Sequence, residues 1–472
     1  MTRPADLPKL ELKDRDALIP AVFTQLAVLK DRVEQLAAEN AGLCAENARL
    51  RAENAALQAK LTLPPKTPGN SSVPPSRGHK ASAPSTSPAK KTPHAGTHRA
   101  LHPHPTSQRD CLARHCQHCG SDVSGAAQVL CEVYDRIEMP MIEPEVTRVS
   151  LYGGTCPCCA RRFKAEPPSG LEPGSPFGPN LRAFVIYLRA VQGLPLERLS
   201  HALRDLFGLR ISEGALVNIL SASRQPFGIQ TSAIKDRLMS APALASDETG
   251  IRVSKANWWL WVFHHGDSAA FMIERRRSKA VVEAFLGDHR PDYWISDRYG
   301  AQMGWAAKEH QVCLAHLIRD VQYVIDVGDA GFAPALKGLL KRACAIGRRQ
   351  PDLADTTLKR YKADLDKRLD RLMDRTPTLL AGVKLHRLIK KVRHHLFVFV
   401  TNRDLSATNN GSERALRPSA VYRKITNGFR SEWGAALYAD IRSVIETARR
   451  RAIRAIDAIR LTLEGKILPS AA

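Results

Sequence analysis

The sequence predicts a multidomain protein of mixed α+β/α class, in which helical segments surround one α/β domain. Three observations support this prediction. A leucine recurs every seven residues near the N-terminus, two Cys-x-x-Cys pairs follow a Pro/Ser-rich stretch, and apolar runs typical of strands begin after residue 240. At 472 residues the chain is long enough for about three or four domains, so each pattern can represent a separate one.

The charge of the chain indicates a polyanionic partner. The formal net charge is +23 and the pI is about 9.8. An excess of this size favours nucleic acid over a membrane surface. No apolar run reaches the ~18 residues of a membrane span, and the N-terminus lacks the apolar core of a signal peptide. We therefore expect a cytoplasmic protein whose ten cysteines are metal ligands or thiols rather than disulfides.

Residues 20–62 are expected to form one long helix after an N-terminal tail, residues 1–19. Pro20 suits the first helical position, and Pro64 and Pro65 cannot continue the helix. The leucine repeat predicts a coiled coil that pairs two or more copies of the chain. A single amphipathic helix packed on its own protein is the alternative. The repeat consists of Leu29, Leu36, Leu43, Leu50 and Leu57, with Asn40, Asn47 and Asn54 on the same seam.

Residues 63–109 change abruptly in composition and are expected to be a basic, flexible linker. Proline, serine, threonine, glycine and histidine dominate this segment, and no aspartate or glutamate occurs in it. Such a composition cannot bury a core. The cations of the linker either contact DNA phosphates or only keep the tether solvated.

Residues 110–172 are expected to form a zinc-binding domain of the zinc-ribbon type. Two Cys-x-x-Cys pairs supply four thiolates, which fit one structural, tetrahedral Zn²⁺. Extended segments at residues 128–133 and 145–152 are predicted to form a hairpin between the pairs. The expected ligands are Cys116, Cys119, Cys156 and Cys159, and the alternative ligands are Cys111, His115, His118 and Cys158.

Residues 173–240 are predicted to be helices with short breaks. One helix covers 181–191, the next covers 196–206, and a third begins after Ser212, which is a good N-cap. A helix, a turn containing Gly208 and a second helix make a helix-turn-helix-like arrangement, whose second helix can enter a DNA major groove. An ordinary helical hairpin is the alternative.

An α/β domain is expected from residue 241, with its first part ending at 314. A basic helical insertion, 315–403, separates this part from the second part and a C-terminal helix, 404–472. Two of the strands lead to an aspartate, so both aspartates should lie at one end of a sheet. The expected strands are 243–247, 250–253, 258–264, 269–274, 293–296 and 311–314, with a helix over 279–286.

Three acidic motifs stand at the ends of these predicted elements. Asp247 and Asp297 follow strands, and Glu413 follows a pair of asparagines that suit a helix start. Such widely separated carboxylates are what a two-metal phosphoryl-transfer site needs, with two Mg²⁺ or Mn²⁺ ions between them. Without cations, three crowded carboxylates would hold protons. Glu248 is expected to point to the opposite face of the strand from Asp247 and to lie outside this set.

These motifs resemble those of RNase-H-like DDE transposases, and more closely the large transposase of the insertion-sequence-sixty-six family. The resemblance extends from the N-terminal zipper, through the Asn70-Ser71-Ser72 segment, to the C-terminal part. It implies an RNase-H-like catalytic domain in which Asp247, Asp297 and Glu413 form the DDE triad. The matching segments are Asp247-Glu248-Thr249-Gly250, Ser296-Asp297-x-Tyr299, Cys313-Leu314-Ala315-His316 with Arg319, and Asn409-Asn410-x-x-Glu413-Arg414 with Arg417-Pro418.

The resemblance implies a bacterial DNA transposase that binds the inverted repeats at element ends and catalyses metal-dependent cleavage and strand transfer. The implied partners are double-stranded DNA, a second copy of the chain and accessory proteins encoded by the element, and DNA binding would place the protein at the nucleoid. Two alternatives are an inactive, transposase-derived DNA-binding dimer and a metal-dependent nuclease without strand transfer. The residues expected to contact phosphate or support the metal site are His316, Arg319, Arg414 and Arg417, with a buried core role as the alternative for His316.

Overall fold

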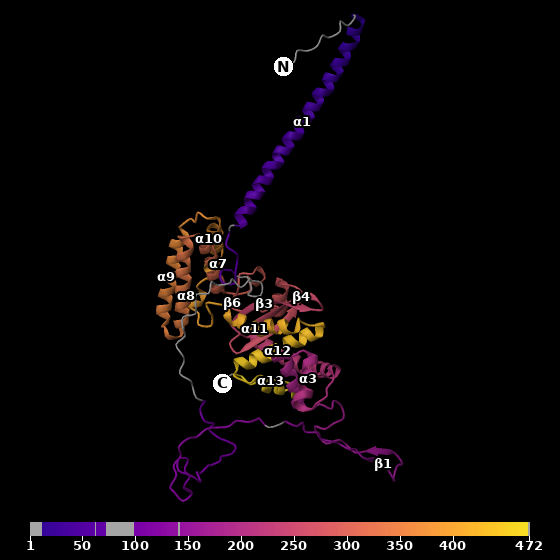
Figure 1. Cartoon of the computed structure of the whole chain (residues 1–472), viewed down its shortest axis with the longest axis vertical. Helices are drawn as coiled ribbons and strands as arrows, with labels where there is room; N and C mark the ends of the chain where they lie inside the picture. The colour runs from indigo at the N-terminus through magenta and orange to yellow at the C-terminus, as the bar shows by residue number, and fades with distance from the viewer. Residues whose placement is uncertain (1–11, 62, 72–98, 140–141, 471–472) are drawn as a thin grey trace. The chain divides into compact units, whose positions relative to one another are not determined.

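The computed structural model describes residues 12–61, 63–71, 99–139 and 142–470 (Figure 1). The chain divides into two units. The first takes residues up to 78, 316–339 and 369–391, and the second takes 79–315, 340–368 and 392–472. Parts of the predicted tail and linker, residues 1–11 and 72–98, lie outside the described residues. Within the described residues, no helix combines the length and the apolar character needed to cross a membrane.

The leucine repeat lies on one long helix, α1, Leu12–Leu61. This helix begins before Pro20, so the prediction that Pro20 occupies its first position was wrong. Inside a helix, a proline removes one N–H donor and its ring crowds the carbonyl group four residues earlier. All five leucines of the repeat are exposed on the single chain, each by about half of its surface. Pairing of two such helices would bury this seam, and the coiled coil stays a prediction.

The first part of the predicted linker is packed rather than free. Asn70 is 7% exposed. Its side-chain oxygen accepts from the N–H of Thr67 at 2.7 Å, and its Nδ2 donates to the carboxylate of Asp326 at 2.9 Å. Asp326 ends helix α7, Leu314–Asp326, in the same unit. One amide therefore closes a turn and fixes residues 65–71 to a helix, which corrects the prediction of a flexible linker for this stretch.

Residues 315–403 are helical, as predicted, and their role as an insertion stays a prediction. In α8 the fully buried residues recur at three- and four-residue spacing, which places them on one face of the helix. The structure describes every residue of this range and shows helices and short 3₁₀ turns without a strand. The helices are α7, α8 (Phe332–Arg349), α9 (Asp355–Met373) and α10 (Leu380–Val392), and the turns are η3 (Gln350–Asp352), η4 (Arg393–His395) and η5 (Val398–Val400).

The hairpin of the cysteine-rich region differs from the prediction. Residues 128–133 and 145–152 form no strand. The only pair of strands in the described residues of 110–172 is β1, Gly153–Thr155, with β2, Arg162–Lys164. This short hairpin encloses the second Cys-x-x-Cys pair, because the knuckle itself supplies the reversal of the chain.

The helices predicted for 173–240 are confirmed with small shifts. Ser212 caps α4 as expected, since its side chain accepts from the N–H of Ala215 at 3.3 Å. Gly208 ends α3 in the left-handed region, with φ of 67°, where a glycine carries no strain. The elements are α2 (Pro179–Ile186) continued by the π-helix η1 (Tyr187–Val191), α3 (Leu196–Phe207), α4 (Glu213–Ala222) and α5 (Arg224–Met239).

The α/β domain is built on a five-stranded mixed sheet with the order β5-β4-β3-β6-β7. The first three strands form an antiparallel meander, and β6 and β7 run parallel to β3. The two expected strands 243–247 and 250–253 are one strand, and the last strand ends two residues earlier than expected. The strands are β3 (Ala243–Val253), β4 (Ala256–His265), β5 (Ser268–Glu274), β6 (Tyr293–Ser296) and β7 (Glu309–Val312), with α6 (Lys279–Leu286) between β5 and β6.

Helices cover both faces of this sheet. Trp261 and Phe263 of β4 join a core that includes residues of α5, α6 and α13. Leu260 and Val262, which point the other way, pack in a core with Leu416 and other residues of α11. The mixed α and β class is thereby confirmed. The remaining helices are α11 (Asn410–Thr426), α12 (Glu432–Arg450) and α13 (Ala455–Leu463).

Helix α12 also closes the open edge of the sheet at β5. The hydroxyl of Ser443 accepts from the N–H of Phe271 at 2.8 Å. One turn further on, the hydroxyl of Thr447 accepts from the N–H of Ala269 and donates to its carbonyl, both at 3.1 Å. Ser443 and Thr447 are one helical turn apart, and their hydroxyls bind backbone groups of Phe271 and Ala269, which are two residues apart on β5. These backbone groups of the edge strand are therefore not left open to another strand.

Candidate functional site

Asp247 and Asp297 lie at the same end of two adjacent parallel strands. Strand β3 pairs with β6 in the register Ala245 with Ile295. Each aspartate follows its paired residue by two positions, so the two carboxylates emerge side by side from the sheet. One oxygen of each is held by the backbone: the N–H of Glu248 donates to Asp247 Oδ1 at 2.9 Å, and that of Tyr299 donates to Asp297 Oδ1 at 2.8 Å.

Glu413 reaches the same region from the first turn of α11. The pKa of Asp247 is raised well above its ordinary value by burial, and then by the negative charges of Glu248, Asp297 and, more weakly, Glu413. A carboxylate feels such charges strongly only when they are near. Asp297 and Glu413 therefore both lie within electrostatic reach of Asp247, although Glu413 is far from the other two along the chain.

The donor set of this cluster fits hard divalent cations. Mg²⁺ and Mn²⁺ prefer carboxylate oxygens, and crowded carboxylates that hold protons release them when a cation arrives. In the described parts of the chain, no three His, Cys, Asp or Glu side chains converge closely enough to make a preformed metal site. A metal site at these carboxylates stays a prediction.

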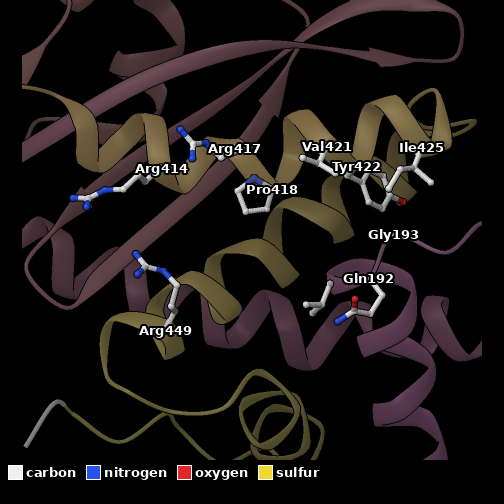
Figure 2. A pocket seen from close by; sticks show the side chains of 10 residues that line it. Gln192, Gly193, Arg414, Arg417, Pro418, Val421, Tyr422, Ile425 and Arg449 are labelled. Carbon is white, nitrogen blue, oxygen red and sulfur yellow. The ribbon is translucent and has the colours of Figure 1, made fainter. Parts of the chain in front are cut away.

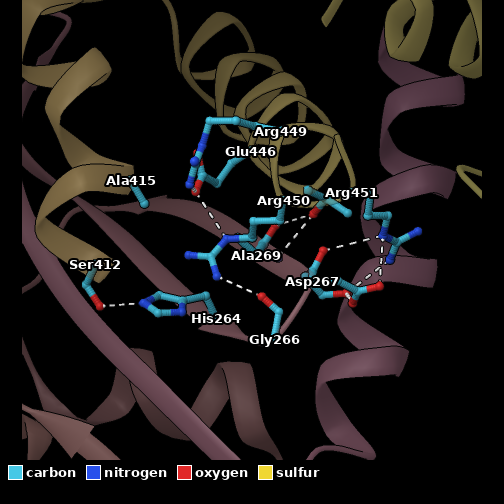
Figure 3. A network of polar contacts seen from close by, with 12 residues as sticks. His264, Gly266, Asp267, Ala269, Ser412, Ala415, Glu446, Arg449, Arg450 and Arg451 are labelled. Carbon is cyan, nitrogen blue, oxygen red and sulfur yellow. Dashed lines mark hydrogen bonds and ion pairs between the residues drawn. The ribbon is translucent and has the colours of Figure 1, made fainter. Parts of the chain in front are cut away.

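A chain of polar contacts fixes the start of α11 against the sheet. Asn409 is 2% exposed, and its Nδ2 donates to the carbonyl oxygen of Ser246 on β3 at 2.7 Å. Its Oδ1 accepts from the hydroxyl of Ser412 at 2.6 Å. Ser412 in turn contacts His264 Nε2 on β4 at 2.9 Å (Figure 3). These contacts hold the turn of helix that carries Glu413 at a fixed position beside Asp247.

The directions of these hydrogen bonds determine the tautomer of His264. The amide of Asn409 donates to a carbonyl, so its oxygen is the acceptor for Ser412. Ser412 spends its only proton on that bond, and His264 Nε2 must therefore carry a proton and donate to the serine oxygen. Burial, and then the charge of Arg450, lower the pKa of His264 well below its ordinary value. His264 is consequently a neutral, Nε2-protonated donor.

Two further residues allow this close approach. The Cys313 thiol is fully buried and its sulfur accepts from the N–H of Asn409 at 3.1 Å, while its own N–H donates to the carbonyl of Ser296 at 2.9 Å. Cys313 thus bridges the second and third acidic motifs. Position 411 is a glycine, and a Cβ added there would lie only 3.0 Å from His264 Cε1. The sequence motif includes Cys313, but nothing in the sequence predicted that Cys313 connects the second and third acidic motifs.

Glu248 lies nearer to the cluster than the sequence suggested. Its side chain is fully buried, and it pairs with Arg277 and accepts from Gln302 Nε2, each at 2.6 Å. Burial, and then the charge of Asp297, raise the pKa of Glu248. Since both carboxylate oxygens already have protein partners, Glu248 is suited to support the site rather than to bind a cation. No sequence pattern pointed to Arg277 or Gln302, which come from a loop and a 3₁₀ turn.

Arg277 also steadies the loop of Asp297. Its guanidinium lies 3.8 Å from the ring centroid of Tyr299 and 4.8 Å from that of Trp259. The hydroxyl of Tyr299 donates to the carbonyl of Arg277 at 2.6 Å. Arg277 therefore links the strand of the first acidic motif to the loop of the second.

The predicted basic residues separate into two groups. Arg414 and Arg417 follow Glu413 on α11, are exposed, and line a pocket in the second unit (Figure 2). His316 and Arg319 are half-buried residues of α7 that belong to the first unit. Arg414 and Arg417 thus share a helix with Glu413, and the roles expected for all four residues stay predictions.

A cluster of arginines surrounds the buried carboxylate of Glu446 on α12 (Figure 3). Arg449 donates to it at 2.6 and 2.9 Å, and Arg450 donates at 3.1 Å. Burial acts to raise the pKa of Glu446, but these hydrogen bonds and charges outweigh it and lower the pKa. Arg450 also donates to the carbonyl of Gly266 at 2.9 Å, which ties α12 to the turn between β4 and β5.

The two cysteine pairs form equivalent knuckles. The N–H of Gly120 donates to the carbonyl of Cys116, and the N–H of Ala160 donates to that of Cys156, both at 2.9 Å. Hydrogen bonds from Ser121 lower the pKa of Cys119, and backbone hydrogen bonds from Cys159 and Cys158 lower the pKa of Cys156. Lowered thiol pKa values favour the thiolate that Zn²⁺ requires. The structure does not unite the two knuckles into one ligand set, and the zinc site stays a prediction.

The second helix of the helix-turn-helix-like segment has little charge for DNA contact. The exposed side of α4 includes Glu213 and Asn218, and no lysine or arginine occurs between Glu213 and Ala222. Its buried residues, Leu216 and Ile219, pack in a small core with α2 and α3. DNA binding by this segment stays a prediction.

Comparison with known proteins identifies one family. Residues 174–437 match the family described as Transposase IS66 family, which is more than half of the chain. The match includes the sheet, the helical insertion and all three acidic motifs. No curated protein matches the chain significantly.

Proposed function

Because this chain belongs to the IS66 transposase family, we propose that it cuts and joins DNA through a DDE site formed by Asp247, Asp297 and Glu413. The observation that supports this most directly is the electrostatic coupling of the three carboxylates, which come from β3, the loop after β6 and the start of α11. We further propose that the sheet and its helices are RNase-H-like, as the resemblance implies.

The three carboxylates act as one group in this proposal. Asp247 is affected electrostatically by both of the others, and the three carboxylates together would hold two Mg²⁺ or Mn²⁺ ions. The bound ions supply Lewis-acid activation of the attacking oxygen and stabilise the leaving oxygen. The Asn409–Ser412–His264 chain keeps Glu413 oriented, and the Glu248–Arg277 pair keeps the Asp297 loop in place.

The surrounding parts would serve DNA binding and assembly. The net charge of +23 supports binding of double-stranded DNA at the element ends and at the target. We propose that α1 pairs two or more chains, that the four knuckle cysteines hold one structural Zn²⁺, and that the protein acts in the bacterial cytoplasm at the nucleoid, with accessory proteins of the element as further partners.

The test is cleavage and strand transfer with Mg²⁺ on the inverted repeats that flank the gene. Wild type should nick and join these ends, and Asp297→Asn should lose both activities by at least about a hundredfold while DNA binding is kept. Asp288→Asn, an exposed aspartate on the same unit, is the matched control.

Two outcomes would favour the other functions. Binding of the repeats without Mg²⁺-dependent nicking, in wild type as in Asp297→Asn, would identify an inactive DNA-binding protein. Nicking without joining would identify a nuclease. Equal activity of wild type and Asp297→Asn would overturn the triad assignment.

A further inference from the structure

A pocket of about 470 Å³ lies along α11, the helix that also carries Glu413 (Figure 2). Its size is within the range of ligand clefts and is too large for a lone phosphate ion. We call it the α11 pocket. Its walls come from α11, from the end of α12 and from the turn after η1, and are formed by Val191, Gln192, Gly193, Arg414, Arg417, Pro418, Val421, Tyr422, Ile425 and Arg449.

The α11 pocket changes character along the helix. Its α11 residues recur at three- and four-residue spacing, so they form one stripe on one face. Arg414 and Arg417, at the end next to Glu413, are cationic. Val421 and Ile425, at the other end, are 51% and 46% exposed. The stripe thus has a cationic half toward the end of α11 that carries Glu413 and an apolar half toward the other end.

A third cation lies on the opposite wall. Arg449 of α12 lines the pocket, and its guanidinium is oriented by the buried Glu446, with an N–O distance of 2.6 Å. Its side chain remains 62% exposed. Among the lining residues, all of which are in the described part of the chain, none is acidic. The cationic half therefore suits an anion, and the arginine forks suit a phosphate in particular.

The apolar half has few groups that could read a base by hydrogen bonds. Tyr422 is 4% exposed, and the guanidinium of Arg189 lies 5.1 Å from its ring centroid, so the ring is a wall rather than a free stacking platform. The Nε2 of Gln192 is already bound to the hydroxyl of Tyr187 at 2.9 Å. Contacts in this half would be apolar and tolerant of base identity.

The cationic and apolar halves meet where Arg417 and Val421 lie four residues, ~6 Å, apart along the helix, so the complementary ligand has a phosphate next to a flat apolar body. A nucleotide that is not paired in a duplex has this form. We propose that the α11 pocket holds an unpaired nucleotide of the DNA strand that is cut, with its phosphate on Arg414 and Arg417 and its base against Val421 and Ile425. This inference rests on the proposed function, since it assigns the strand by the adjacency of Arg414 to Glu413.

Binding of the full-length protein to labelled DNA in Ca²⁺ tests the proposal without requiring catalysis. Three probes share one duplex: a blunt form, a form with a short unpaired 3′ tail, and a form whose tail consists of abasic nucleotides. The unpaired tail should tighten binding about tenfold, and the abasic tail should lose most of this gain. The salt dependence of each affinity is measured in the same experiment.

Variants separate the two halves of the pocket. The double variant Val421→Ser/Ile425→Ser should reduce the tail preference to nearly one while the affinity for blunt duplex is kept. Arg417→Ala should weaken binding of all three probes and reduce the slope of log Kd against log salt by about one. Ile229→Ser removes an apolar residue that is 63% exposed on α5, outside the pocket, and should leave the tail preference unchanged.

Several results would overturn the pocket proposal. These are equal affinity for blunt and tailed probes, equal affinity for normal and abasic tails, an unchanged tail preference in the double variant, or no binding of any probe. The proposed catalytic function is judged separately by cleavage in Mg²⁺. Asp297→Asn should keep the tail preference in Ca²⁺, so failure of the triad and failure of the pocket give different results.

Discussion

Asn409 joins the third acidic motif to the strand of the first, because its Nδ2 donates to the carbonyl oxygen of Ser246 at 2.7 Å. Ser246 directly precedes Asp247, and Asn409 directly precedes the helix that carries Glu413. A single buried amide therefore connects the segments that carry Asp247 and Glu413, which are far apart along the chain.

Loss of this amide should impair catalysis more than DNA binding. Asn409→Ala removes the bonds to Ser246 and Ser412, so Glu413 loses its fixed position and the rate of DNA cleavage should fall about a hundredfold. Cleavage rate and DNA affinity are measured in parallel. The neighbouring Asn410 is exposed, and Asn410→Ala should leave both nearly unchanged. Equal effects of the two substitutions would contradict the role of Asn409.

Gly411→Ala should displace the start of α11. The added Cβ would meet His264 Cε1 at 3.0 Å, which forces the helix or the imidazole to move. We expect a loss of stability of about 1–3 kcal/mol and slower DNA cleavage. Gly214 is also the second residue of a helix, but a Cβ there has no atom within 4 Å. Gly214→Ala should therefore be neutral or slightly stabilising in the same urea titration, and a similar loss in both variants would count against the steric argument.

Arg277 and Arg275 allow a buried ion pair to be compared with an exposed one. Arg277→Ala leaves the buried Glu248 without its cation and should cost about 3 kcal/mol of stability. Arg275 pairs with Glu432, and both side chains are largely exposed, so Arg275→Ala should cost less than about 1 kcal/mol. Each arginine also lies over a tryptophan, but Arg277 lies over Tyr299 as well, so a second substitution is needed to isolate the carboxylate. Adding Glu248→Gln to Arg277→Ala should restore part of the stability, and no restoration would refute the charge argument.

Asp440 should make stability depend on pH. Burial raises the pKa of Asp440 to about 6, against the opposing effect of a hydrogen bond from Thr231. A raised pKa means that the folded state holds the proton more tightly, so stability should fall as pH rises from about 4 to about 6 and then stay level.

Asp440→Asn removes this penalty. The variant should be more stable than wild type by about 1–3 kcal/mol at neutral pH, and the difference should vanish near pH 4. Urea unfolding at several pH values measures it, with the exposed Asp352→Asn as control. A difference that is independent of pH would show that titration of Asp440 is not the cause.

The equivalence of the two knuckles predicts which cysteines hold zinc. Cys119 and Cys159 occupy the same position in their knuckles, while Cys158 corresponds to His118. Purified protein should contain one Zn²⁺ per chain, and Cys159→Ser should lose it, whereas Cys158→Ser should keep it. Metal analysis of the two variants decides between the ligand sets. Loss of zinc in Cys158→Ser alone would assign the alternative ligand.

Local patterns predicted most elements of the fold because each depends on neighbouring residues. The Ser212 cap, the glycine after α3 and the aromatic run of β4 act within a few residues, and the structure places them as expected. The predicted hairpin at residues 128–133 and 145–152 was wrong. Runs of apolar residues favour strands, but a strand forms only where another strand pairs with it. The packing of Asn70 on α7 was missed because its partner, Asp326, is far along the chain.

By itself, the sequence determined which three carboxylates are the candidates, their position at the ends of strands and helices, and the family to which the chain belongs. Only the tertiary structure decided how the carboxylates are held: Asn409 on Ser246, His264 as a neutral donor to Ser412, and Glu248 enclosed by Arg277 and Gln302. The reason is physical. Strand and helix propensities are local, whereas burial, hydrogen-bond direction and the pKa of a carboxylate depend on which distant residues the fold brings into contact.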